Sequence, residues 1–232
     1  MARTAHGRAG SVGREVNRPG SAVVAKPGPT AAANQLSARG KRTRTTLINA
    51  ARDVFEAAGF SEARVADIAQ RAQVAYGSFY TYFESKEEIF REVLKQVTGE
   101  MFDASAVAHD AAATPLARLE FANRRYLQAY ARNARIMAVI EEVAPYDNYS
   151  HELLGAIRRL FLRRIELGVV HQQKVGRLDG TLDPNMVARA LGGMIEQTAR
   201  GAFLHGEPYD EESAVHVLTT LWSNAVGDLN YG

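Results

Sequence analysis

No cysteine occurs among the 232 residues of this sequence, so disulfide bonds and metal sites built on thiolates are excluded. Long apolar runs are also missing, because no uninterrupted stretch approaches the ~18 residues that would cross a bilayer. The N-terminal segment lacks the apolar core of a secretory signal. A chain without cysteine is typical of a reducing compartment, so we expect a cytoplasmic protein that does not enter a membrane.

Sequence patterns of catalysis and metal binding are absent as well. The six histidines are scattered without the spacing of metal ligands, and no glycine-rich phosphate loop or nucleophile elbow occurs. The neighbouring acids Glu141 and Glu142 diverge if they lie on a helix. We therefore predict no metal, no cofactor and no enzymatic activity, and an enzyme is the weakest of the functions considered.

The alternating pattern of β-strands is lacking. Apolar residues instead recur every three to four positions over most of the chain after residue 43, which is the period of an α-helix. Three short segments up to residue 82 are followed by predicted helices over 85–107, 115–131, 134–144, 149–174, 184–205 and 210–227. The sequence therefore predicts an all-α protein of about nine helices, with a three-helix head over 39–84 and a helical bundle over 85–232.

Charge is distributed unevenly, although the net charge is only +2. Residues 1–44 contain nine Lys or Arg and one acidic residue, whereas the remainder contains 19 basic and 25 acidic residues. Residues 1–38 are rich in Gly, Pro, Ala and Ser, so we predict a basic arm that is disordered without a partner. The excess of positive charge indicates a contact with nucleic acid, mainly through Arg39 to Arg44, although many such extensions are only solvated tails.

Residues 43–94 have the spacing of a helix-turn-helix, a unit that places one short helix in the major groove of DNA. The first helix has an apolar face that includes Leu47 and Phe55, and it ends at Gly59, a residue that readily becomes left-handed. A short second helix begins at Val65, and a three-residue turn over 73–75 follows it.

The third segment of this unit is predicted to run from Tyr76 to Tyr82. Phe79 and Phe83 are four residues apart and should point inward together. Ser85 is the predicted N-cap of the next helix, with Glu88 as its capping-box partner. The residues left on the outer side of the third segment are Gly77, Ser78, Thr81 and Tyr82.

This segment resembles the N-terminal domain of the TetR family of transcriptional regulators. The resemblance covers roughly fifty of the 232 residues, and beyond about Val97 it extends only to helix content and length. The matching residues are Ala50-Ala51, Phe55, Gly59-Phe60, Val65, Asp67-Ile68-Ala69, Ala72, Val74, Gly77, Phe79-Tyr80, Tyr82-Phe83, Ser85-Lys86 and Ile89.

The resemblance implies a role in DNA binding for several positions. Ser78 matches a position that faces base edges, while Tyr80, Tyr82 and Lys86 match positions that meet the phosphate backbone. Hydroxyls, ammonium groups and helix N-termini are suitable phosphate anchors, although Tyr80 and Tyr82 are also compatible with ordinary half-buried aromatics. The candidate DNA-binding residues are Arg44, Arg64, Tyr76, Gly77, Ser78, Tyr80, Thr81, Tyr82 and Lys86.

Three residues depart from the pattern of the family. Arg64 stands where a Ser or Thr caps the second helix, so we expect no side-chain cap there but still a phosphate contact. Gln73 replaces a common glycine, from which we predict that the turn needs no positive φ. Ala75 replaces a frequent Ser or Thr before the third helix.

The last two predicted helices indicate a pairing surface. Small residues recur at three- and four-residue spacing over 186–201, and the last helix has a broad apolar stripe that is also compatible with burial against its own chain. The resemblance implies a four-helix interface in a homodimer, which would present two recognition helices to two half-sites. The candidate interface residues are Ala190, Gly193, Met194, Gln197, Leu218, Leu221 and Trp222.

The middle helices are candidates for a ligand site. Their aromatic and methionine side chains share faces at helical spacing, a pattern that is more typical of a core than of a pocket, whereas the resemblance implies a cavity in this bundle. The candidate ligand-binding residues are Tyr126, Tyr130, Met137, Tyr149 and Phe161. The arginines at 158, 159, 163 and 164 fit the anionic tail of an acyl-coenzyme A or a solvated face.

These features together predict a repressor that leaves a palindromic, double-stranded DNA operator when it binds an apolar or amphipathic small molecule. The main alternative is a helical architectural protein that binds DNA without any effector. A cavity in the middle bundle distinguishes the two, because only the regulator requires one.

Overall fold

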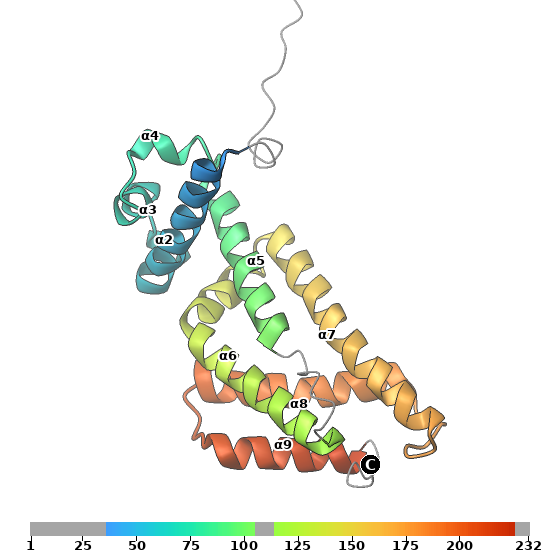
Figure 1. The fold of residues 1–232 in the computed structure, drawn as a ribbon. Helices are drawn as coiled ribbons and strands as arrows, with labels where there is room; N and C mark the ends of the chain where they lie inside the picture. Colours follow the sequence, from blue (N-terminus) through green and yellow to red (C-terminus); the bar gives the residue numbers. More distant parts are fainter. Residues whose placement is uncertain (1–35, 105–113, 226–232) are drawn as a thin grey trace, which may run out of the picture.

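The computed structural model describes residues 36–104 and 114–225, and within them the chain forms eight helices and no strand. This confirms the predicted all-α class (Figure 1). Most of the predicted basic arm lies outside the described residues. No helix of the described ranges is long and apolar enough to cross a membrane, and no group of three or more potential metal ligands occurs in them.

The head consists of α2 (Ala38–Glu62), α3 (Val65–Arg71) and α4 (Tyr76–Phe79). The Ser37 hydroxyl caps α2 by accepting a hydrogen bond from the Gly40 amide at 3.2 Å. Gly59 interrupts α2 with a φ of 75°, which confirms the helix end predicted there. The fully buried side chains of the head belong to its three helices and to the residues that follow them; they include Leu47, Phe55, Ile68, Phe79 and Phe83.

Helix α4 is shorter than predicted, because it ends at Phe79 and not at Tyr82. The amides of Thr81 and Tyr82 donate to the carbonyls three residues earlier, at 3.2 and 2.9 Å. Such bonds tighten a helix end and turn the chain. The tight turn carries Phe83 back beside Phe79, with a ring distance of 5.7 Å, and both rings are buried as predicted.

The turn after α3 contradicts the prediction made from Gln73, because this residue has a φ of 55°. The Gln73 amide donates to the Gln70 carbonyl, and the Val74 amide donates to the Ala69 carbonyl, both at 3.0 Å. These two bonds define a Schellman helix end, which requires a left-handed residue at this position. Glutamine therefore adopts, at some cost, a conformation that glycine would adopt freely.

Five longer helices complete the chain: α5 (Lys86–Ala104), α6 (Pro115–Val143), α7 (Asn148–Lys174), α8 (Pro184–Leu204) and α9 (Glu211–Ala225). The Ser85 hydroxyl accepts from the Glu88 amide at 3.2 Å, as predicted for an N-cap of α5. The Glu88 carboxylate accepts from the Glu84 amide at 2.6 Å, so the reciprocal bond of the capping box falls one residue earlier than expected.

The two helices predicted over 115–131 and 134–144 are one helix, α6, and the break expected at Asn133 does not occur. The Asn133 amide group donates to the Ala129 carbonyl at 2.8 Å. Its Oδ1 accepts from Arg52 of α2 at 2.7 Å. Asparagine disfavours a helix interior when it competes with the backbone, but here both ends of its amide group have partners, so the helix continues.

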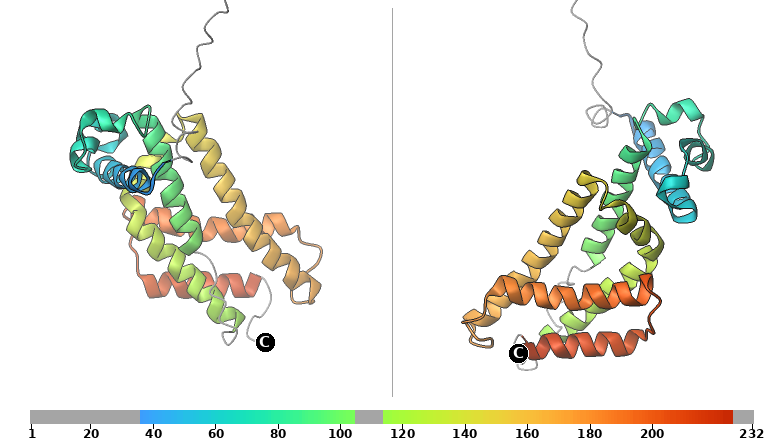
Figure 2. Two further views of the ribbon diagram at one scale, coloured as in Figure 1. Left: turned by 45° about the horizontal axis from the view of Figure 1, so that its top comes forward. Right: turned by 180° about the vertical axis from the view of Figure 1, so that it is seen from behind.

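The helices of the second domain surround a space rather than a continuous core. Helix α5 descends from the head between α6 and α7, and α8 and α9 run side by side across the end farthest from the head (Figures 1 and 2). One apolar cluster joins the head to α6 through Ile136, Val139, Ile140 and Val143. A second joins α6 to α8 and α9. The arrangement thus places α6 in contact with both parts of the molecule.

Candidate DNA-binding surface and ligand cavity

The exposed side of α4 carries a pair of tyrosines. Tyr76 and Tyr80 are 55% and 47% exposed, their hydroxyls are 3.0 Å apart, and their rings meet edge to face at 5.5 Å. The hydrogen bond with Tyr76 raises the pKa of Tyr80, so the Tyr80 phenol is neutral near pH 7. Gly77 and Thr81 are exposed beside them.

Two further candidates on this surface are less accessible. Ser78 is half-buried, and Tyr82 packs against the apolar cluster of the head, as the alternative interpretation of a half-buried aromatic anticipated. Their contacts with DNA remain predictions. Arg64 is exposed, and it precedes α3 without a side-chain cap, as expected.

Lys86 is already engaged within the head. Its ammonium group donates to the carbonyls of Phe60, Ser61 and Ala63 at 2.7, 3.2 and 3.0 Å. It also lies 4.6 Å from the centre of the Phe60 ring. An ammonium has three N–H donors, and all three are used here, so the phosphate contact of Lys86, which stays a prediction, would require it to give up one of these bonds. Lys86 thus fixes the connection between α2 and α3 to the start of α5.

Arg44 is held in a similar way. Its guanidinium forms an ion pair with Glu92 of α5 at 2.6 Å and lies 5.0 Å from the centre of the Phe83 ring. The side chain therefore fastens α2 to α5 and to the end of the recognition segment, rather than extending freely toward DNA. The exposed basic groups at the start of α2 are Arg39, Lys41 and Arg42.

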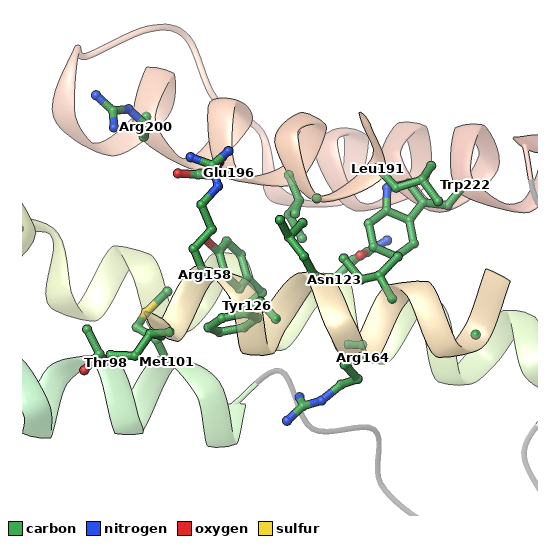
Figure 3. A pocket seen from close by; sticks show the side chains of 18 of the residues that line it. Thr98, Met101, Asn123, Tyr126, Arg158, Arg164, Leu191, Glu196, Arg200 and Trp222 are labelled. Atoms are coloured by element: carbon green, nitrogen blue, oxygen red, sulfur yellow. Dashed lines mark ion pairs between the residues drawn. The ribbon is translucent and has the colours of Figure 1, made fainter. Parts of the chain in front are cut away.

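A cavity of about 630 Å³ lies in the second domain, and residues of α5, α6, α7, α8 and α9 line it (Figure 3). Three of the five predicted ligand residues, Tyr126, Met137 and Phe161, are part of its wall. Burial raises the pKa of the Tyr126 phenol, so this group is uncharged. The volume lies within the range of pockets that enclose small organic ligands.

Tyr130 and Tyr149 do not line this cavity, which corrects their predicted role. Tyr130 is buried beside Phe203, with a ring distance of 6.2 Å, so it is a core residue. Tyr149 turns toward α5, where Arg91 and Lys95 lie 4.9 and 5.6 Å from the centre of its ring. Helical periodicity showed that these rings share faces with their neighbours, but it did not show which helix each face meets.

Other residues of the wall were missed by the sequence analysis. They include Thr98 and Met101 of α5 and Leu191 and Ile195 of α8. Helix α8 had been interpreted only as a pairing helix, whereas its opposite face borders the cavity. Trp222, which was assigned to the dimer interface, also lines the cavity.

Charged side chains at one end of the cavity form ion pairs. Arg158 pairs with Glu196 at 3.1 Å, and Arg200 pairs with Glu141 at 2.9 Å; Figure 3 shows Arg158, Glu196 and Arg200 close together at this end. Arg164 lies over the Phe102 ring at 3.9 Å and donates to the Phe102 carbonyl. The arginines at 158, 159 and 163 are exposed, so most of this basic cluster is a solvated face.

The outer side of α8 and α9 contains four of the seven predicted interface residues. Ala190, Gln197 and Leu221 are exposed, and Gly193 is half-exposed with open space where a Cβ would project. Met186 of α8 and Val217 of α9 are exposed as well. The other three predicted residues pack within or against the chain's own apolar clusters, and their place in an interface stays a prediction; they are Met194, Leu218 and Trp222.

Comparisons with known proteins agree with this architecture. Residues 47–93 match the family described as bacterial regulatory proteins, tetR family. The HTH-type transcriptional regulator YdgC of Bacillus subtilis is 24% identical over 188 residues, which are 80% of this chain and 94% of that protein. The fatty acid metabolism regulator protein of the same organism is 22% identical over 165 residues, or 71% of this chain and 85% of that protein.

Solved structures share the fold. The fatty acid degradation regulator FadR from Bacillus halodurans has a TM-score of 0.66 at 19% identity, covering 82% of this chain and 97% of that one. FadR from Bacillus subtilis, crystallised in complex with stearoyl-CoA, has a TM-score of 0.63 at 20% identity, covering 77% of this chain and 96% of that one. Residues 47–93 thus match the tetR family of bacterial regulatory proteins, and over most of its length the chain is similar to transcriptional regulators.

Proposed function

We propose that this regulator is a cytoplasmic homodimer that represses transcription from a palindromic operator and is released by an apolar or amphipathic small molecule. The observation that carries the proposal is the cavity of about 630 Å³ beside the head. An architectural protein without an effector has no need of such a space. The stearoyl-CoA in the complex of Bacillus subtilis FadR supports an amphipathic effector here, including an acyl-coenzyme A.

The wall of the cavity couples ligand binding to the position of the head. Met137 and Ile140 of α6 line the cavity and also pack in the apolar cluster of the head. A ligand that displaces these side chains shifts the surface on which the head rests. Release of DNA requires only that the ligand bind the non-DNA state better, by a typical factor of ~5–150, and operator DNA then weakens ligand binding by the same factor.

Pairing through the outer side of α8 and α9 supplies the second recognition helix. A single four-residue helix, α4, contacts few bases, whereas a twofold dimer reads two half-sites about 34 Å apart. Gly193 has room for a side chain within the protomer. Gly193→Arg should therefore leave the protomer folded and still separate the dimer.

The experiment on pairing measures sedimentation and operator affinity together. We expect Gly193→Arg to sediment as a monomer at micromolar concentration and to lose operator affinity by at least about tenfold. Gly99→Arg is the matched control, because Gly99 lies on α5 and also has open space around it. A wild-type protein that sediments as a monomer contradicts the proposal.

The experiment on release uses operator fragments selected from the organism's own DNA, with hexadecanoate and hexadecanoyl-coenzyme A as probes. Phe161→Trp should fill part of the cavity and weaken release by the probes while operator affinity stays within about twofold, because Phe161 lines the cavity but lies outside the cluster of the head. Leu160→Trp is the control, since Leu160 is exposed on the other side of α7. Operator affinity that no probe or cell extract changes would leave a DNA-binding protein without an effector.

A further inference from the structure

The cavity runs along α7, whose lining residues extend from His151 to Gln172. The residues of α7 that line it include Arg158, Phe161, Ile165, Val169 and Gln172, which recur every three or four positions along one face. Arg158 and Gln172 are fourteen residues apart, which corresponds to about 21 Å along a helix. On α8, the lining runs from Leu191 to Arg200, about 13 Å by the same measure.

The two ends of the cavity differ in their access to solvent. Arg158 and Arg200 at one end have side chains that are 58% and 36% exposed, and each is neutralised by a carboxylate. This end is open and carries no net charge. Figure 3 places Leu191 and Trp222 at the opposite end, where Val169 and Leu191 are buried in an apolar cluster that Trp222 packs against.

The inner end contains two polar atoms that lack partners. The indole Nε1 of Trp222 and the Oε1 of Gln172 are both buried, and neither has a hydrogen-bond partner in the structure. Both residues line the cavity. Buried polar atoms without partners are rare and costly, and each requires an explanation. Here one atom is a donor only and the other is an acceptor.

We infer that the effector is an elongated apolar chain of about sixteen carbons with a hydroxyl group at its inner end. This inference rests on the proposed function, in which the cavity is the effector site. A hydroxyl both donates and accepts, so it accepts from the Trp222 indole and donates to the Gln172 carbonyl. A methyl end leaves both atoms unpaired, and a carboxylate offers no proton to Gln172 and suffers burial of its charge.

The length of the apolar chain follows from the distance between Arg158 and Gln172 along α7. Carbon–carbon bonds of about 1.5 Å at tetrahedral angles advance an extended chain by about 1.25 Å per carbon. A span of about 21 Å therefore holds about sixteen to seventeen carbons. The other end of the chain lies at the open end, where a carboxylate or a larger polar group remains in water beside Arg158 and Arg200.

The experiment compares 16-hydroxyhexadecanoate with hexadecanoate on the full-length protein in the absence of DNA. Trp222 is the only tryptophan in the sequence, so its fluorescence reports binding directly, and calorimetry serves the variants. We expect the hydroxy acid to bind about tenfold more tightly, as expected for two hydrogen bonds that satisfy buried atoms. Hydroxy acids of eight and twelve carbons should bind more weakly than that of sixteen.

Two variants locate the effect. Trp222→Phe removes the donor and keeps an aromatic ring, and Gln172→Leu removes the acceptor and keeps the size of the side chain. Each should reduce the ratio of the affinities for the hydroxy acid and for hexadecanoate, both measured on the same variant, to about threefold or less. Thermal unfolding of both variants shows whether the fold is retained, and two different substitutions guard against the failure of one.

Equal affinity for the two acids overturns the inference, because buried water would then satisfy the two atoms equally well in both complexes. A preference that survives in both variants overturns it too. Operator release is measured separately with the same probes. A hydroxyl preference without release contradicts the proposed function alone, whereas release by compounds that lack a hydroxyl, with no preference in binding, contradicts this inference alone.

Discussion

The head and the bundle of this protein solve opposite packing problems. In the head, the rings of Phe55, Phe79 and Phe83 have no exposure, and the ammonium group of Lys86, at the start of α5, fixes the connection between α2 and α3. In the bundle, five helices enclose about 630 Å³ of space, and four buried side-chain polar atoms of the described residues lack a partner, among them the Trp222 Nε1 and the Gln172 Oε1 that line this space. A surface that reads DNA must be rigid in register, whereas a ligand site must hold unfilled volume, which costs stability.

The largest expected difference between the two regions is the cost of removing a ring. Phe55→Ala should destabilise the protein by ~3–5 kcal/mol, because a fully buried ring leaves a cavity in a close-packed core. Phe161→Ala should cost less than ~2 kcal/mol, because this half-buried ring already borders a cavity and loses fewer contacts. Urea unfolding of both variants measures the difference, and equal losses would contradict the comparison.

The next effect concerns the ammonium group in the head. Lys86→Met should destabilise the head by ~2–3 kcal/mol, since three carbonyls lose hydrogen bonds to a charged donor. Hydrogen exchange of the amides around residues 60–63 should accelerate, and binding to all DNA sequences should weaken about equally.

Lys95→Met is the control for this variant, because its exposed ion pair with Glu92 is worth ~0–1 kcal/mol. Unchanged stability of Lys86→Met, together with a salt dependence of DNA binding reduced by about one counterion, would support the phosphate contact predicted from the sequence.

A smaller effect concerns the contact between α5 and the start of α7. Hydrogen bonds from Arg91 and from Ser150 hold the pKa of Asp147 at about 2, below its ordinary value of 3.8. Because the folded-state pKa is lowered, this contribution is present above about pH 4 and is lost as the pH falls toward 2. After allowance for solvent screening it amounts to ~1 kcal/mol.

Asp147→Asn tests this contribution. The variant should be less stable at pH 6, and the difference from the wild type should shrink between pH 4 and pH 2 in urea unfolding. A difference that stays constant over this range would exclude a role for the charge.

The smallest expected effect is a gain. Gln73→Gly should stabilise the head by ~0.5–1 kcal/mol, because glycine takes the positive φ of the Schellman turn without strain. Gln70→Gly, on the exposed side of α3, should instead destabilise by about 1 kcal/mol. Thermal unfolding of the two variants in parallel measures both signs, and a loss at both positions would contradict the strain at Gln73.

Local patterns accounted for what the sequence predicted well. The buried pair Phe79 and Phe83, the helix end at Gly59 and the cap at Ser85 each depend on neighbours within four residues, and all were found. The left-handed conformation of the turn after α3 was not predicted, because the type of a residue indicates only which φ values it prefers. At Gln73 the hydrogen bonds of the helix end outweigh the preference of glutamine for a negative φ.

Distant partners explain the remaining differences. Helix α6 continues through Asn133 because Arg52, 81 positions earlier, donates a hydrogen bond to the Asn133 side chain. Lys86 donates to carbonyls 23 to 26 positions away. The three- and four-residue spacing of a helix does not reveal pairs that lie so far apart in the sequence. Likewise, periodicity identified the apolar faces of α8 and α9, but it did not show that Trp222 faces a cavity and Leu221 faces outward.

The shared wall at Met137 and Ile140 has a consequence for how such a regulator acquires new effectors. A substitution there that admits a different ligand also alters the cluster that supports the head, so specificity and DNA affinity change together. Leu191, Gln172 and Trp222 line the far end, outside that cluster. We therefore expect the effector specificity of this chain to change most readily through substitutions at the end of the cavity remote from the head, because such substitutions leave the affinity for the operator unchanged.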